Sequence, residues 1–236
     1  MKGMILAAGL GTRLGEITQH IPKCLVVVRG KPLLAHAIEH LKAIGITYIV
    51  INTHHFADQV AHYLAEQNNF GITIHLSYEP TLLDTGGGLY NARSHFEGER
   101  EFLLHNADVY HELDLNKLVA QHRERCPIAT LLVMTRQTSR YLVFDSEQNL
   151  VGRVSGGGDE PQLVRDTAVQ SLYAFSGIHV ISPGFFRFLE GFPPTFSIID
   201  GYLEAARQGA TVHAHLVEDG EWSDVGTPER LEALKE

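Results

Sequence analysis

A short hydrophobic strand at the start of the chain runs directly into a glycine-rich loop. The strand covers residues 4–7, and the loop at 8–14 reads Ala-Gly-Leu-Gly-Thr-Arg-Leu. Because glycine has no Cβ, Gly9 and Gly11 allow several backbone N–H groups to turn toward one concave surface. Such a loop at the carboxyl end of a strand is typical of α/β proteins that bind phosphate groups.

Two cationic side chains accompany this loop. Arg13 lies within it, and Lys23 follows shortly afterwards, beyond Thr18 and Pro22. A guanidinium group binds two phosphate oxygens at once, whereas a lysine supplies a mobile point charge. This combination suits a triphosphate that is both held and cleaved. We therefore expect a nucleotide-binding site that includes Ala8, Gly9, Gly11, Thr12, Arg13 and Lys23.

Other glycine-loop classes fit the sequence less well. A dinucleotide fingerprint needs a third glycine where Leu14 stands and an acidic residue where Asn52 stands. The chain contains no Gly-Lys-Ser/Thr tripeptide of a Walker loop and no His-Arg-Asp or Asp-Phe-Gly motif of a protein kinase. A glycine turn used only for packing would leave the two spaced cations without a role.

Composition limits the class of protein further. The 236 residues, 44% of them hydrophobic, are enough for one substantial core, so we expect one domain over residues 1–236. The net charge of −9 and the absence of a basic cluster argue against a nucleic-acid partner. With no apolar run of membrane-spanning length and no leader before the first strand, we expect a cytoplasmic protein without a membrane partner. Cys24 and Cys126 are expected to be free thiols.

Hydrophobic periodicity predicts alternating strands and helices through residue 135. After the first strand, buried strands are expected at 46–51, 72–76, 102–104 and 128–134, and helices at 34–44, 56–64 and 115–122. This order predicts a doubly wound, mostly parallel sheet, with ligands at the carboxyl ends of its strands. The remainder, 136–236, begins with a β-rich insertion, a hairpin at 141–154, and is expected to bind a second substrate. Gly156 to Gly158 predict a linker or a mobile lid.

The pattern L-A-A-G-x-G-T-R-L…T…P-K-x-L over residues 6–25 resembles the N-terminal signature of the sugar-1-phosphate nucleotidyltransferases. The resemblance implies a Rossmann-like, GT-A-like α/β fold whose residues 1–135 bind the nucleotide and whose 136–236 bind the sugar. It also implies that Arg13 and Lys23 are catalytic and stabilise the leaving pyrophosphate. Leu10 and the Gly15-Glu16 pair depart from the usual signature and affect loop shape rather than either cation.

Two aspartates occupy positions suited to a metal ion. Asp108 follows a predicted strand, and Asp224 lies in Trp-Ser-Asp-Val-Gly-Thr just before the last predicted helix. Carboxylate oxygens are preferred ligands of Mg²⁺, and phosphoryl transfer commonly uses such an ion. Both contexts resemble the metal-binding aspartates of the family, although Ala107 replaces its usual glycine. The structural alternatives are a loop-capping acid at Asp108 and a helix-entry acid at Asp224.

A second glycine-rich segment, 82–88, reads Leu-Leu-Asp-Thr-Gly-Gly-Gly. Consecutive glycines at the head of a helix allow a flat ligand to approach the backbone closely. Its L-x-T-G-G-G form resembles the N-acetylmuramate-1-phosphate uridylyltransferase branch of the family. We therefore expect Thr85 and Gly86, together with Asn52, to contact the nucleotide. For the sugar, the resemblance at Phe175-Ser176-Gly177 implies a contact by Gly177, with Asn106 and Arg140 as further candidates.

The sequence thus predicts a Mg²⁺-dependent enzyme that joins an NTP to a sugar 1-phosphate and releases pyrophosphate. The branch resemblance favours UTP and N-acetylmuramate 1-phosphate as the small-molecule partners. Two alternatives stay open. One is guanylyl or cytidylyl transfer to mannose or heptose 1-phosphate or to phosphocholine, and the other is a catalytically silent nucleotide-sugar sensor. Base, sugar, number of metal ions and oligomeric state have no signature in the sequence.

Overall fold

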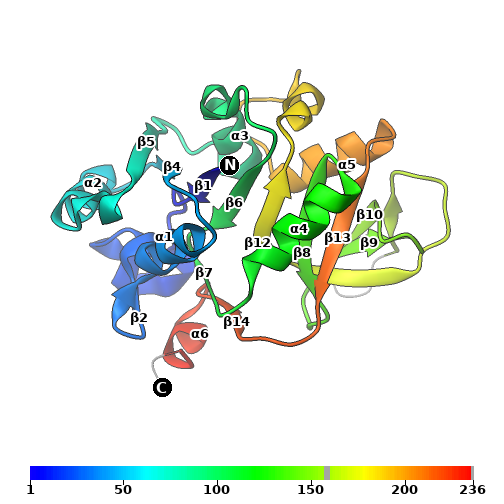
Figure 1. Cartoon of the computed structure of the whole chain (residues 1–236). Coiled ribbons are helices and arrows are strands. Elements are labelled where there is room, and N and C mark those ends of the chain that lie inside the picture. Colours follow the sequence, from blue (N-terminus) through cyan, green and yellow to red (C-terminus); the bar gives the residue numbers. More distant parts are fainter. Residues whose placement is uncertain (157–159, 235–236) are drawn as a thin grey trace.

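The fold is built on a twisted ten-stranded sheet (Figure 1). A computed structural model describes residues 1–156 and 160–234 of the chain. At the centre, β1 pairs in parallel with β4 on one side and β6 on the other, and β5 pairs in parallel with β4. These strands are β1 Lys2–Leu6, β4 Tyr48–Thr53, β5 Thr73–Tyr78 and β6 Phe102–Asn106. Their carboxyl ends therefore meet at one edge of the sheet.

One long strand, β12, joins the two parts of the sheet. It runs antiparallel to both β6 and β8, and β13 extends the sheet in parallel with β8. The first residues of β12 pair instead with β9, which continues into β10 and β11. The strands are β8 Ala129–Met134, β9 Arg140–Phe144, β10 Leu150–Ser155, β11 Gln162–Leu163, β12 Ser171–Ile181 and β13 Val212–Val217.

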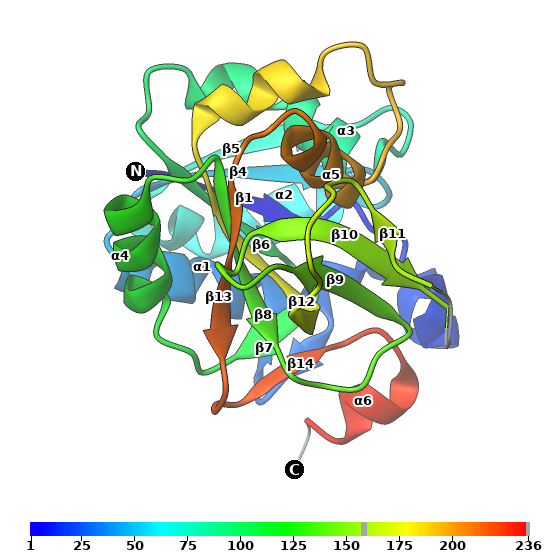
Figure 2. The same cartoon turned by 90° about the vertical axis from the view of Figure 1, so that its right-hand side faces the viewer.

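Helices cover both faces of the sheet (Figures 1 and 2). Neighbouring strand residues point to opposite faces, so Met4 lies in one hydrophobic cluster and Ile5 in the other. One cluster includes residues of α1 Leu33–Ala43, α2 Ala57–Glu66 and α4 Leu115–Arg125, and the other includes residues of α3 Asp84–Asn91 and α5 Ile198–Arg207. Burial on both faces explains why the central strands are nearly continuous runs of aliphatic residues.

Short elements close the carboxyl edge of the sheet. β7 follows β6 after two residues and pairs with β14, and the latter leads into α6 at the end of the chain. A separate two-stranded ribbon, β2 with β3, precedes α1. Their bounds are β2 Val27–Val28, β3 Lys31–Pro32, β7 Val109–His111, β14 Trp222–Asp224 and α6 Pro228–Glu232; five 3₁₀ segments cover Thr12–Gln19, Lys23–Leu25, Asn68–Gly71, Arg93–Phe96 and Pro183–Leu189.

The predicted α/β fold is confirmed, with one difference in detail. The sheet crosses residue 135, because β8 pairs only with β12 and β13 from the second half of the chain. Of the predicted linker or lid at 156–158, only Gly156 lies inside the described residues. Both cysteines are free thiols, as expected, and burial raises the pKa of Cys24 to about 12. No helix in residues 1–156 or 160–234 is long and apolar enough to cross a membrane.

Three histidines, one each from α1, β6 and β7, pack together. The Nε2 atoms of His105 and His111 lie 3.1 Å apart, and the ring of His40 stacks on His111 with centroids 4.0 Å apart. Burial lowers the pKa of His105 to about 3 and that of His111 to about 2, and it also lowers the pKa of His40. The folded protein therefore holds this cluster neutral.

This cluster predicts a loss of stability in mild acid. The histidine pKa values are depressed in the folded state, so their stabilisation is complete above pH 6.5, the unfolded value, and is lost as the pH falls toward 3. Urea denaturation across this range should show that the free energy of unfolding falls less with decreasing pH in His111→Asn than in the wild type. The asparagine amide oxygen can accept the Leu113 N–H in place of His111 Nδ1, and it does not titrate. The exposed His62→Gln on α2 serves as the control; identical pH slopes in all three proteins would contradict the prediction.

Candidate active site

The glycine loop leaves β1 and turns immediately into a 3₁₀ segment. Gly11 has φ +67°, which favours glycine, and its carbonyl accepts a hydrogen bond from the Thr18 hydroxyl at 2.9 Å. A Cβ on Gly11 would lie 2.9 Å from Cγ2 of Thr18. Gly9 has no positive φ, and a Cβ there would meet no atom within 4 Å. Gly11 is thus required for the turn, whereas Gly9 borders open space.

A cavity of about 340 Å³ lies where this loop meets the ends of β4 and β6. We call it the glycine-loop cavity. Six residues predicted from the sequence line it together, although they come from widely separated parts of the chain. They are Ala8, Gly9, Asn52, Thr85, Asn106 and Asp108, joined by Leu6, Leu82, Asp84 and Thr195. Asn106, predicted to contact the sugar, thus shares this cavity with residues predicted to contact the nucleotide.

Asn52 forms hydrogen bonds that hold the walls of this cavity together. Its Oδ1 accepts a hydrogen bond from the Ala7 N–H at 2.7 Å, and its Nδ2 donates to Oε1 of Glu79 at 2.7 Å. Glu79 is fully buried and also accepts from the Leu83 N–H at 3.0 Å. This pair ties the end of β1 to the entry of α3. The side chain of Asn52 thus positions the glycine loop and also lines the cavity, and its contact with a nucleotide stays a prediction.

The glycines of α3 have a packing role. A Cβ on Gly86 would lie 2.3 Å from the ring of Phe196, and one on Gly87 would lie 2.2 Å from the carbonyl oxygen of Pro194. The Gly86 N–H donates to the Phe196 carbonyl at 2.9 Å, and the Thr85 hydroxyl accepts from the Ile198 N–H at 2.9 Å. Segment 194–198 thus fills the space that a side chain at position 86 would need, and the contact of Gly86 with a nucleotide stays a prediction.

A valine at position 86 should destabilise the protein. Gly86→Val drives a branched side chain into Phe196, and overpacking of a core typically costs about 1–3 kcal/mol. Thermal melting should show a clear fall in Tm. The matched control is Gly9→Ala, whose added methyl meets open space and should leave Tm unchanged. An unaltered Tm in Gly86→Val would show that α3 tolerates displacement from segment 194–198.

The two predicted metal aspartates come together through backbone pairing. Asp224 pairs in register with Val109, and the Val225 N–H donates to the Asp108 carbonyl at 2.8 Å. Each carboxylate has a cationic partner: Lys23 Nζ donates to Asp108 Oδ2, and Arg230 Nη1 donates to Asp224 Oδ1. Lys23 is nearly buried, with 9% of its surface exposed. The structure thus places Lys23, Asp108 and Asp224 at one edge of the sheet.

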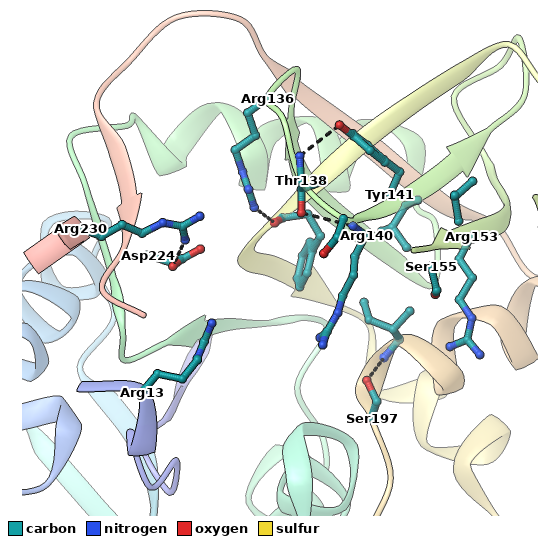
Figure 3. A pocket seen from close by; sticks show the side chains of 15 residues that line it. Arg13, Arg136, Thr138, Arg140, Tyr141, Arg153, Ser155, Ser197, Asp224 and Arg230 are labelled. Atoms are coloured by element: carbon teal, nitrogen blue, oxygen red, sulfur yellow. Dashed lines mark hydrogen bonds and ion pairs between the residues drawn. The ribbon is translucent and has the colours of Figure 1, made fainter. Parts of the chain in front are cut away.

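A second and larger cavity, of about 900 Å³, opens beside Asp224 (Figure 3). We call it the arginine cavity. Five arginines line it: Arg13, Arg136, Arg140, Arg153 and Arg230. Of these five, Arg13 was predicted from the sequence to contact the nucleotide and Arg140 to contact the sugar. Arg136 follows the carboxyl end of β8, where ligands of α/β sheets bind, so its position could have indicated the site. The positions of Arg153 in β10 and Arg230 in α6 gave no such indication.

Arg136 is anchored within this cavity. It packs over the Trp222 ring at 4.3 Å, and its Nη2 donates to the Phe175 carbonyl at 3.0 Å. Its Nε is buried without a hydrogen-bond partner in the described structure. Burial lowers the pKa of Arg136, while the nearby Asp224 carboxylate acts in the opposite direction. A half-buried guanidinium group that lines a cavity is suited to an anionic ligand.

Gly177 lies behind the cavities rather than in them. It has φ +80°, and a Cβ there would lie 2.8 Å from Nδ2 of Asn106. The β12–β8 pairing shifts register between Phe175 and His179, on either side of this glycine. Gly177 is buried and packs against Asn106, which it helps to position, and its contact with a sugar stays a prediction.

The fold and the site together define a class of protein. A doubly wound sheet carries a glycine loop, a buried lysine and paired aspartates at its carboxyl edge, beside a cavity rich in arginine. This is the arrangement of an α/β protein that binds phosphorylated small molecules.

Comparison with known proteins identifies the family. The model of the nucleotidyl transferase family matches residues 2–236, and the chain belongs to this family of nucleotidyltransferase enzymes. It is 32% identical over 233 residues to the probable mannose-1-phosphate guanylyltransferase 2 of Oryza sativa subsp. japonica, covering 97% of this chain and 62% of that protein. It is 27% identical to the UTP–glucose-1-phosphate uridylyltransferase of Synechocystis sp., covering 100% of this chain and 63% of that one. The chain thus spans less than two thirds of these relatives.

Solved structures agree on the fold. The putative glucose-1-phosphate thymidylyltransferase of Bacillus anthracis superposes with a TM-score of 0.83 at 23% identity, covering 100% of this chain and 94% of that one. HddC of Yersinia pseudotuberculosis, solved with GMP-PN, has a TM-score of 0.77 at 24% identity, covering 99% and 97% respectively. Identities this low establish a shared architecture and leave the substrate to be determined.

Proposed function

We propose that the protein transfers a nucleotidyl group from an NTP to a sugar 1-phosphate, forming an NDP-sugar and pyrophosphate. The NTP would occupy the glycine-loop cavity and the sugar 1-phosphate the arginine cavity. The observation that carries this proposal is the junction between the two cavities, where Asp108 from one and Asp224 from the other are joined by the Val225–Asp108 hydrogen bond. Two bound phosphates would meet there.

The chemistry asked of the protein is alignment and charge stabilisation. An oxygen of the sugar phosphate attacks the α-phosphorus of the NTP, and the bond to the pyrophosphate oxygen breaks. The attacking phosphate is already an anion at neutral pH, so no general base is required. Arg13 and Lys23 would stabilise the charge on the leaving pyrophosphate. Arg136, which lines the arginine cavity, would hold the acceptor phosphate.

The aspartates fit a Mg²⁺ ion. Asp108 and Asp224 offer carboxylate oxygens, partly exposed and each already paired with a cation, which marks both positions as favourable to positive charge. No group of three or more His, Cys, Asp or Glu in residues 1–156 and 160–234 forms a complete metal site. Mg²⁺ usually combines one or two carboxylates with substrate phosphates and water, so two aspartates suffice. A bound ion would neutralise phosphate charge.

For the nucleobase, guanine is the first candidate. The earlier expectation of UTP rested on the glycine run of α3, which the structure explains by packing against Phe196 and Pro194. The rice relative described above is named as a guanylyltransferase, and the cyanobacterial relative as a uridylyltransferase. We therefore propose GTP ahead of UTP, with mannose or heptose 1-phosphate and N-acetylmuramate 1-phosphate among the acceptors to compare.

A pyrophosphate-release screen tests this proposal. The purified protein is incubated with Mg²⁺, each of GTP, UTP, CTP, ATP and dTTP, and a panel of sugar 1-phosphates. We expect pyrophosphate to form with one preferred NTP and only when a sugar 1-phosphate is present, with the matching NDP-sugar detected by mass spectrometry. Absence of product from every pair, with intact folding and nucleotide binding, would favour a silent sensor instead.

A further inference from the structure

The arginine cavity has two ends (Figure 3). At one end, Arg13 and Arg230 flank the Asp224 carboxylate. At the other, Arg140, Arg153, Ser155 and Ser197 gather between the β9–β10 hairpin and the start of α5. We call this second group the distal end. It lies across the cavity from the carboxylate that marks the reacting phosphates, so it faces a different part of the acceptor.

The two distal arginines differ in how they are held. Arg153 is fixed from two sides, since its Nη1 contacts Asp200 Oδ1 at 2.6 Å and its Nε contacts Gln162 Oε1 at 3.2 Å. The side chain of Arg140 makes no hydrogen bond or ion pair within residues 1–156 and 160–234, and its guanidinium points into the cavity in Figure 3. Asp200 balances the charge of Arg153, which leaves Arg140 as an uncompensated cation.

The hydrogen-bonding groups of the distal end are mainly donors. Arginine donates only, whereas the Ser155 and Ser197 hydroxyls both donate and accept, and Ser197 Oγ already accepts from the Ile199 N–H at 3.3 Å. Among the described residues that line the cavity, Asp224 is the single carboxylate, and it lies at the opposite end. Sugar hydroxyls both donate and accept, so they are best read by side chains that also accept. A lining rich in guanidinium groups instead matches a ligand group that only accepts hydrogen bonds, such as a carboxylate or phosphate.

The position of the distal end assigns it to a second anion. The phosphate that attacks the NTP has to lie near Asp108 and Asp224 to be aligned. Arg140 and Arg153 occupy the other side of the cavity, where the remainder of the sugar would extend (Figure 3). When the reacting phosphate of the acceptor lies at the Asp224 end, it cannot also contact Arg140 and Arg153 at the distal end.

We propose that the distal end binds an acidic substituent on the acceptor, so that the preferred substrate is a sugar 1-phosphate carrying a second anionic group. The shared chemistry is a carboxylate or a second phosphate placed away from C1. This inference rests on the proposed nucleotidyl transfer for the identity of the first phosphate. The distal arginines would then act as specificity-determining residues.

Matched acceptors test this proposal. One series keeps the glucose ring and varies C6: glucose 1-phosphate, glucuronic acid 1-phosphate and glucose 1,6-bisphosphate. A second pair keeps the N-acetylglucosamine ring and varies C3: N-acetylglucosamine 1-phosphate and N-acetylmuramate 1-phosphate. We expect an acidic member of at least one series to exceed its neutral partner by about tenfold or more in kcat/KM, the scale of one charge-assisted hydrogen bond. The two acidic glucose derivatives distinguish carboxylate from phosphate.

Variants connect the preference to the distal end. Arg140→Gln removes the uncompensated charge at an exposed position and should bring the acidic-to-neutral ratio close to one. Arg153→Gln should also lower this ratio, with Tm measured because Asp200 loses its partner. The control is Arg207→Gln, an exposed arginine on α5 that pairs with Glu204 outside the cavity. A ratio unchanged in Arg140→Gln would overturn the proposal.

The outcomes separate this inference from the proposed function. Product from neutral acceptors with no acidic preference in either series would leave the proposed reaction intact and overturn the distal subsite. If no acceptor yields pyrophosphate, the proposed reaction fails, and calorimetric binding of the same matched compounds then decides the subsite. Tighter binding of the acidic members that is lost in Arg140→Gln would support it, and equal binding of acidic and neutral members would overturn it.

Discussion

Replacing Arg13 by alanine is expected to lower kcat by about 10²–10³, the usual effect of losing one preorganised charge-stabilising donor. The side chain of Arg13 projects from the glycine loop toward Asp224 (Figure 3). A Cβ on Gly226 would lie 2.9 Å from Asp224 Oδ1 and 3.0 Å from Arg13 Nη2, so both groups approach the same glycine. Arg13 makes no ion pair within the described residues and is thus available to a phosphate. Pyrophosphate release under saturating substrates measures the effect.

Two further variants make the Arg13 result specific. Arg13→Lys keeps the charge but loses the bidentate geometry, so it should recover only part of the lost activity. Arg93→Ala removes an arginine that packs on Tyr90, outside both cavities, and should leave turnover unchanged. Because Arg13 is exposed and free, Tm should stay constant in both Arg13 variants. Turnover within a fewfold of wild type in Arg13→Ala would place leaving-group stabilisation elsewhere.

The parts of the site that were readable from the sequence depend on local geometry. Gly11 precedes the cation of its own loop, and its positive φ is a property of that loop alone. Asp108 follows a strand whose hydrophobic run is evident, so its place at the carboxyl edge was predictable. Asp224 reaches the same edge because its short segment forms β14 against β7. In each case a few consecutive residues carry the information.

The parts that were missed depend on how distant strands pair. Arg136 and Arg153 share a cavity because of the way β12 pairs. Its first residues pair with β9, and its later residues lie antiparallel between β6 and β8. No local pattern specifies that order, so the arginines could not be grouped in advance. The α3 glycines show a different limit. A glycine that admits a ligand and one that admits Phe196 have the same sequence signature, and only packing distinguishes them.

Replacing Asp108 by asparagine is expected to reduce kcat/KM on the order of 10³-fold. On the proposed metal role of Asp108, loss of its charge removes several kcal/mol of charge stabilisation, and each 1.36 kcal/mol corresponds to about tenfold in rate. Asp224→Asn should act in the same direction, since the two aspartates adjoin through the β7–β14 pairing. Both variants should also need more Mg²⁺ for half-maximal activity. Activity titrated against Mg²⁺ concentration at fixed NTP and acceptor measures both effects.

The ion pairs of the aspartates supply a sharper test than loss of activity alone. In the structure, Arg230 forms an ion pair with the Asp224 carboxylate, and Lys23 forms one with the Asp108 carboxylate. A metal ion that binds Asp224 has to compete with Arg230, so Arg230→Ala should bind Mn²⁺, a spectroscopic substitute for Mg²⁺, more tightly, whereas Asp224→Asn should bind it more weakly. Asp58→Asn on the exposed surface of α2 controls for general charge loss. Equal Mn²⁺ affinity in wild type, Asp108→Asn and Asp224→Asn would mean that the ion, if the reaction uses one, is held by substrate phosphates without these carboxylates.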